Sequence, residues 1–151
     1  MPRTAAEIAA HWCDLFIVVD NGLVTAAEYA RVETVLDAQR KRYPGGLGCL
    51  VIIPQGSAPP PDDVREYLRQ MLARIGIKAL AYVVEGSGFK VATVRAVLVG
   101  LGIFQKKPYV THVTTTIEDA VKWLDTKMPP NAQRKNPLVE VERVVSQVFR
   151  R

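Results

Sequence analysis

The sequence predicts an α/β fold: a mixed, mostly parallel sheet of about five strands with crossover helices, followed by an extra C-terminal amphipathic helix. Three observations predict it. Continuous apolar runs bounded by Gly and Pro are typical of strands covered on both faces. Segments with apolar residues at helical spacing separate these runs, as expected for crossovers between parallel strands. The pair Asn21-Gly22 favours a tight hairpin, and therefore one antiparallel strand near the start.

The first elements follow from residue type and turn chemistry. Thr4–Ala10 is rich in Ala and predicts a short helix. The β-branched and aromatic run Trp12–Val19 predicts a strand. Because Asn21-Gly22 suits a hairpin turn, we expect Leu23-Val24 to begin a short returning strand.

Helix and strand signals then alternate along the chain. Thr25 and Glu28 match a capping box and predict the start of a helix that ends in a group of cations. Gly76 stands where a helix needs a left-handed terminator, and Asn136 with Pro137 predicts the start of the final helix. The pattern further predicts strands at Leu47–Ile53, Lys78–Val84 and Pro108–Val113, and helices from Asp62 to Ile75, Phe89 to Leu101 and Thr116 to Lys127.

Length and composition bound the class of protein. The chain has 151 residues, 48% hydrophobic and 23% charged, which are ordinary values for a globular protein. Collagen-like, disordered and disulfide-scaffold classes are therefore excluded. We expect one α/β domain over residues 1–128, and a Pro-bounded linker with a basic amphipathic helix over residues 129–151.

Cysteine usage and hydropathy predict a cytoplasmic protein. Cys13 and Cys49 lie in apolar runs without CxxC spacing, as expected of reduced, buried thiols. Met1–Ala10 lacks the pattern of a secretory signal peptide. The longest nearly uncharged apolar stretch, Ala96–Phe104, is too short for a membrane span of about 20 residues.

Much of the net charge of +5 lies in the tail, where residues 131–151 carry five Lys or Arg against two Glu. The body is close to neutral, whereas a folded nucleic-acid binder should show a basic face. Nucleic acid is therefore not the expected partner, although the basic tail keeps it open as an alternative.

The segment 89–104 is the most unusual predicted helix, because it is apolar nearly all round. Such a helix must bury more than one face. One face would cover the sheet, and the other needs a cover from the C-terminal helix, a second subunit or a lipid. We expect self-association or a protein partner here, with interface residues Val94, Val97, Leu98, Leu101 and Phe104, joined by Leu138, Val141 and Val145 of the last helix.

The order of elements and four segments of the sequence resemble the STAS-like superfamily (sulfate transporter and anti-sigma-factor antagonist domains). The segments are Asn21–Ala38, Leu47–Ile53, Ile77–Glu85 and Thr115–Leu124. The resemblance spans residues 12–127. It implies a small non-enzymatic regulatory domain that binds a protein partner, sometimes switched by serine phosphorylation, a nucleotide or a lipid.

In regulated antagonists, the switch serine follows the strand that corresponds to Leu47–Ile53. Ser57 is the nearest candidate phosphosite in this chain. The Asp-x-Ser frame of the family is missing and prolines intervene, so the resemblance does not extend to the switch motif. A loop residue without modification is the other interpretation of Ser57.

The strand-to-helix turn at residues 85–90 predicts an alternative function, a small-ligand module for a nucleotide, a phosphate or a lipid. Gly86 and Gly88 would allow close backbone approach, Ser87 would donate a hydrogen bond, and Lys90 would supply a counter-charge. Carboxyl ends of parallel strands often form one site, so Gln55–Ser57 could join it. The turn matches neither GxGxxG nor the P-loop, and glycine's conformational freedom explains it equally well.

Catalytic and metal-binding motifs are missing from the sequence. His11 and His112 are the two histidines, and neither stands near a Cys or carboxylate cluster at metal-ligand spacing. The chain has no GxSxG nucleophile elbow. We therefore expect a non-catalytic interaction domain with no cofactor and no metal. The apolar segment 89–104 in addition predicts a homo-oligomer.

Overall fold

The strands form one sheet in the order in which they occur along the chain. The structure, a computed structural model, describes residues 3–86 and 109–149. The first strand pairs antiparallel with the second, and all later pairs are parallel. The predicted mixed, mostly parallel sheet is confirmed, and its five strands are β1 (Ala9–Trp12), β2 (Leu15–Val19), β3 (Gly48–Ile53), β4 (Ala79–Val84) and β5 (Val110–Thr114).

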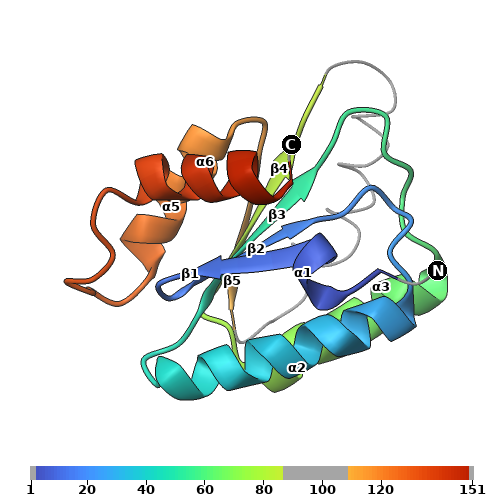
Figure 1. Cartoon of the computed structure of the whole chain (residues 1–151), viewed down its shortest axis with the longest axis horizontal. Coiled ribbons are helices and arrows are strands. Elements are labelled where there is room, and N and C mark those ends of the chain that lie inside the picture. The colour runs from blue at the N-terminus through green and yellow to red at the C-terminus, as the bar shows by residue number, and fades with distance from the viewer. Residues whose placement is uncertain (1–2, 87–108, 150–151) are drawn as a thin grey trace.

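Helices cover both faces of this sheet (Figure 1). On one face, α2 and α3 pack against each other and against alternate strand residues. On the opposite face, α5 and α6 pack together over the intervening strand residues. The described helices are α1 (Ala5–Ile8), α2 (Ala26–Arg42), α3 (Asp62–Ile75), α5 (Ile117–Lys127) and α6 (Pro137–Val148).

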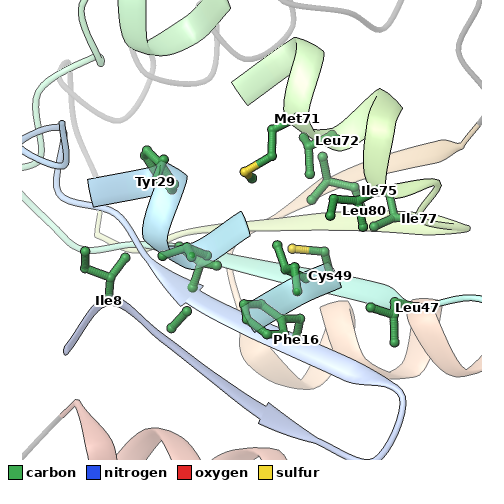
Figure 2. Packing of buried hydrophobic residues seen from close by; sticks show 14 of the residues in the cluster. Ile8, Phe16, Tyr29, Leu47, Cys49, Met71, Leu72, Ile75, Ile77 and Leu80 are labelled. Carbon is green, nitrogen blue, oxygen red and sulfur yellow. The ribbon is translucent and has the colours of Figure 1, made fainter. Parts of the chain in front are cut away.

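The period of two along each strand divides the core into two layers. Phe16 and Cys49 belong to the layer of α2 and α3, and Figure 2 shows both in the same cluster as Met71 and Leu72 of α3. Ile17 and Leu50, their neighbours in sequence, point into the layer of α5 and α6. Each fully buried side chain of this size contributes roughly 1.5–3 kcal/mol, so the sheet depends on both helical layers.

The predicted helix ends are largely confirmed. The Thr25 hydroxyl accepts a hydrogen bond from the Glu28 amide at 3.1 Å, and the Glu28 carboxylate accepts one from the Thr25 amide at 2.9 Å. Gly76 ends α3 in the left-handed conformation, with φ of 71°. Pro137 is the first residue of α6, but the Asn136 side chain makes no capping hydrogen bond, because its backbone is itself left-handed.

The predicted position of the hairpin is wrong. The chain turns at Cys13-Asp14, where Cys13 has φ of 53°, so Trp12–Val19 is divided between β1 and β2. Asn21-Gly22 lies instead in the loop that leads to α2, and Leu23 is 70% exposed rather than part of a returning strand. The loop fits closely there, because a Cβ at Gly22 would lie 2.1 Å from the Ala58 carbonyl oxygen.

The predicted N-terminal helix is also shorter than expected. Residues 5–8 are helical, while Ala9 and Ala10 already pair with β2. Ala has a high helix propensity, but propensity is a weak prior beside strand pairing and burial. The antiparallel strand of the mixed sheet therefore precedes β2 instead of following it.

The cap of α2 gives a direct test of the fold. We expect Thr25→Ala to lower the free energy of unfolding by about 1 kcal/mol, because the Glu28 amide loses its acceptor. Thr34→Ala is the matched control, since Thr34 is exposed within the same helix and bonds back to the Ala30 carbonyl. Urea unfolding measures both variants, and equal losses would contradict a specific capping role.

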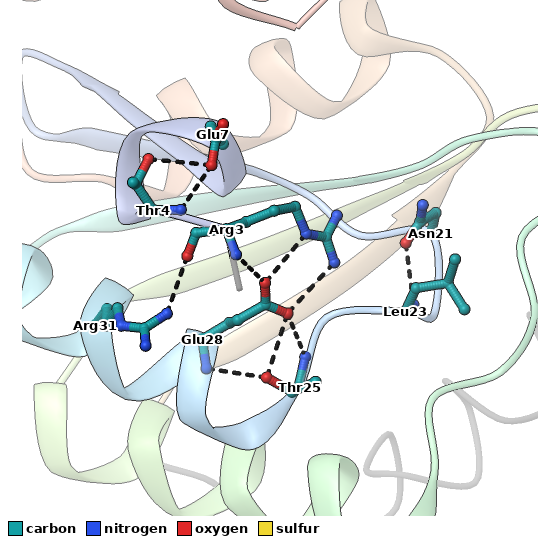
Figure 3. A network of polar contacts seen from close by, with 8 residues as sticks. All are labelled: Arg3, Thr4, Glu7, Asn21, Leu23, Thr25, Glu28 and Arg31. Atoms are coloured by element: carbon teal, nitrogen blue, oxygen red, sulfur yellow. Dashed lines mark hydrogen bonds and ion pairs between the residues drawn. The ribbon is translucent and has the colours of Figure 1, made fainter. Parts of the chain in front are cut away.

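Glu28 also makes stability depend on pH. Amide hydrogen bonds from Thr25 and Arg3 lower its pKa from 4.5 to about 2 (Figure 3). The folded chain thus keeps the carboxylate charged where the unfolded chain protonates it. This contribution is complete above pH 4.5 and is lost as the pH falls toward 2. Glu28→Gln should therefore flatten the decline of unfolding free energy in that window, and an unchanged decline would contradict the assignment.

Candidate functional site

The carboxyl ends of β2, β3 and β4 meet at one edge of the sheet, where α/β proteins usually bind ligands. At the end of β2, the Asp20 carboxylate accepts hydrogen bonds from the Gly22 amide at 2.8 Å and from the buried Tyr29 hydroxyl. Burial, and then the charge of Asp20, raise the pKa of Tyr29 well above its usual value. Asp20 therefore joins the loop to α2, with both carboxylate oxygens already engaged.

At the end of β4, Gly86 comes close to the loop after β3. Its φ is 91°, and a Cβ there would lie 2.6 Å from the Gln55 side chain. The structure thus brings Gly86 and Gln55 together, as the predicted shallow site requires. The close contact also explains why position 86 needs a glycine. The other residues of the predicted turn site, Ser87, Gly88 and Lys90, lie outside the described residues.

Ser57 is held inside its loop. Its side chain donates a hydrogen bond to the Pro54 carbonyl at 2.6 Å, and the residue is 6% exposed. A kinase must reach the hydroxyl oxygen, so phosphorylation would require this turn to open. The geometry favours the interpretation of Ser57 as a loop residue.

An apolar cavity lies behind this edge, on the face of α2 and α3. Tyr82, Val113 and Leu68 are among its lining residues, and its volume is about 70 Å³. Ligand pockets usually measure about 300–1,000 Å³, so the cavity is too small for a nucleotide or a lipid. Burial raises the pKa of Tyr82, which keeps its hydroxyl neutral.

The two arginines that line the same cavity are paired within their own helix. Arg65 pairs with Asp62, and Arg69 pairs with Glu66 at 2.5 Å. These i,i+3 pairs neutralise the guanidinium groups locally. The cavity therefore offers little free positive charge to a phosphate or a carboxylate.

Part of the basic tail is buried and neutralised. Arg134 is 8% exposed and donates to Asp14 at 2.5 Å, to Asp125 at 2.9 Å and to the Pro129 carbonyl at 3.0 Å. Arg143 pairs with a carboxylate of its own helix, α6, at 2.8 Å. The charge available for nucleic acid is thus smaller than the sequence indicates. Asp14 and Arg134 are 120 residues apart, and no local signal predicts their contact.

The residues of the last helix that the sequence assigns to an interface lie in the chain's own core. Val141 is 0% exposed and Val145 is 2% exposed, both packed in the layer beneath α5 and α6. Leu138 is partly buried against the same layer. These side chains pack within the chain itself and are not exposed for contact with a partner. The other expected interface residues, Val94, Val97, Leu98, Leu101 and Phe104, lie outside the described residues.

Among residues 3–86 and 109–149, no group of three or more His, Cys, Asp or Glu is arranged to hold a metal ion. The helices in this part of the chain are too short or too polar to cross a membrane. Comparison with protein-family models, curated proteins and solved structures gave no match. Inference about function therefore starts from the geometry.

The buried ion pair predicts a strong dependence of stability on the tail. Arg134→Ala leaves the Asp14 carboxylate buried without its cation, so we expect a loss of about 3–5 kcal/mol in unfolding free energy. Asp125→Asn is the control, because the Asp125 side chain is 49% exposed and its pair should contribute less than about 1 kcal/mol. Chemical denaturation measures both, and similar small losses would show that the Arg134 pair does not stabilise the fold.

Proposed function

We propose that this protein is a non-catalytic interaction module that self-associates through the segment 89–104. One observation carries the proposal: α6 lies on the face of the sheet opposite α2 and α3. The position of α6 limits which element can cover the second apolar side of the segment 89–104.

The connection from β4 to β5 joins parallel neighbours, as do the connections through α2 and α3. Such crossovers are right-handed in about 98% of cases. Because the strands follow one another in one direction, a common hand predicts the face of α2 and α3 for the connection from β4 to β5 as well. On that face Ile53 and Val84 form a separate apolar cluster with Val51, Tyr82 and Val113. A crossover helix with an apolar side fits this cluster.

The second apolar side of the segment then needs another cover. The sequence leaves the C-terminal helix and a second subunit as the main alternatives. Val141 and Val145 of α6 are already buried beneath the other face, so α6 is not available across the sheet. This supports a second subunit or another protein as the cover.

The STAS-like resemblance is compatible with this proposal. Part of the element order on which it rests, an antiparallel pair followed by parallel strands joined by helices, is present among the described residues. The buried hydroxyl of Ser57 gives no support to a serine switch. We therefore propose binding through a constitutive apolar surface, without phosphorylation at this residue.

Light scattering tests the proposal with a matched pair of variants. We expect the native chain to form a dimer or larger oligomer and Val97→Glu to shift it toward the monomer. Val139→Glu is the control, because Val139 is 64% exposed on α6 and should leave the mass unchanged. Circular dichroism verifies folding of both variants. A native chain that stays monomeric at high concentration, or a Val97→Glu chain of unchanged mass, would overturn the proposal.

A further inference from the structure

At the amino ends of the parallel strands, the molecule carries basic side chains that have no carboxylate partner. Figure 1 shows the C-terminal ends of α2 and α5 at this end of the molecule, at the left of the view. Arg42 is the last residue of α2, and Lys127 is the last residue of α5. Lys78 directly precedes β4, and Lys135 lies in the segment that joins α5 to α6. All four side chains belong to exposed residues.

The lack of an ion pair distinguishes these four residues from the other cations. Every other Lys and Arg in residues 3–86 and 109–149 pairs with a carboxylate, except Arg31. Arg31 instead donates a hydrogen bond to the Arg3 carbonyl at 3.1 Å. The positive charge that the described part of the chain leaves without a carboxylate is therefore concentrated at one end of the molecule.

The cations flank a cleft between the turn after α2 and the segment after α5. The volume of this cleft is about 280 Å³, and Arg42, Gly46 and Pro129 are among its lining residues. The Lys78 side chain lies over Gly46, because a Cβ at Gly46 would clash with it. Lys127 lies two residues before Pro129, on the opposite side of the cleft. Unpaired cations thus border both sides.

The carboxylates at this end do not neutralise the four cations. Asp37 pairs with two cations of α2, which leaves one positive charge in excess. Asp14 and Asp125 share the single Arg134 guanidinium, which leaves one negative charge in excess. These two groups offset each other, so the four unpaired side chains determine the net positive charge of this end.

An extended polyanion fits this arrangement, because it can contact cations on both sides of the cleft at once. Nucleic acids carry one such charge on every phosphate. Single strands are usually bound by exposed aromatic side chains, whereas Tyr43, which lines the cleft, is half-buried. Membrane surfaces are usually bound through an apolar face, and the described residues that line the cleft include no Leu, Ile, Val or Phe. The observations therefore favour a duplex.

We propose that this end of the molecule binds the phosphate backbone of a nucleic-acid duplex through Arg42, Lys78, Lys127 and Lys135. Each side chain neutralises a phosphate and releases condensed counterions, and such contacts carry no sequence information. The surface shares no residue with the segment 89–104 and does not depend on self-association. The two proposals can therefore fail independently.

Fluorescence anisotropy of a labelled DNA duplex tests the proposal on the full chain. We expect saturable binding that weakens about 100-fold between about 50 mM and 200 mM salt, as calculated for about four phosphate contacts. Phosphatidylglycerol vesicles and polyglutamate are the comparison probes. Failure of the duplex to bind overturns the proposal. Tighter binding of either comparison probe also overturns it, because the partner would then be a membrane surface or an acidic protein.

Two lysines of α5 provide a matched pair of variants. Lys127→Ala should weaken duplex binding roughly five- to tenfold at about 0.1 M salt. It should also reduce the slope of log K against log salt concentration by about 0.9. Lys122→Ala is the control, because Lys122 is exposed on the same helix but pairs with Glu118 at 2.8 Å. It should leave both the affinity and the slope unchanged.

Arg42→Ala tests the opposite side of the cleft and should have the same effect as Lys127→Ala. Circular dichroism verifies that each variant folds. Equal weakening by Lys127→Ala and Lys122→Ala would show that net charge alone attracts the duplex. Undiminished binding to Lys127→Ala or Arg42→Ala would show that the duplex contacts another surface. Either result refutes the proposed site.

Discussion

The hand of the crossovers constrains most of this structure. β2, β3 and β4 follow one another in parallel, and a connection of constant hand returns to the same face each time. The helices α2 and α3 therefore share one side of the sheet. The opposite side carries an equal number of apolar strand residues, which helices outside these crossovers must bury. The residues after β5 supply α5 and α6 for that purpose, so α6 is part of the domain's core rather than an appendage.

Local chemistry explains why much of the fold could be predicted. The capping box at Thr25, the left-handed Gly76 and the continuous apolar runs act over a few residues, and each appears in the structure where the sequence indicates. The hairpin could not be placed in the same way. Asn21-Gly22 has the local signal of a hairpin, but the turn lies at Cys13-Asp14, and Gly22 instead packs against Ala58, which lies far along the chain.

The candidate sites likewise differ in whether local sequence or long-range contacts determine them. The need for glycine at position 86 follows from turn chemistry, although its contact with Gln55 gives the actual reason. The buried ion pair of Asp14 and Arg134 joins residues 120 positions apart, and the sequence around either residue does not predict the pair. The net charge of the tail also overstated the positive charge available to a partner. A count of charged residues does not distinguish a solvated guanidinium from one that is paired with carboxylates, as Arg134 is.

The position of α6 has a consequence for synthesis of the protein. Domains begin to fold from the N-terminal side as the chain leaves the ribosome. Residues up to β4 already contain α2 and α3, so one face of the nascent sheet closes early. Leu50, Ile52 and Ala81 on the other face are not covered until α5 and α6, residues 117–148, have been translated. During that interval the growing polypeptide presents a flat apolar surface, which is the kind of surface that chaperones protect.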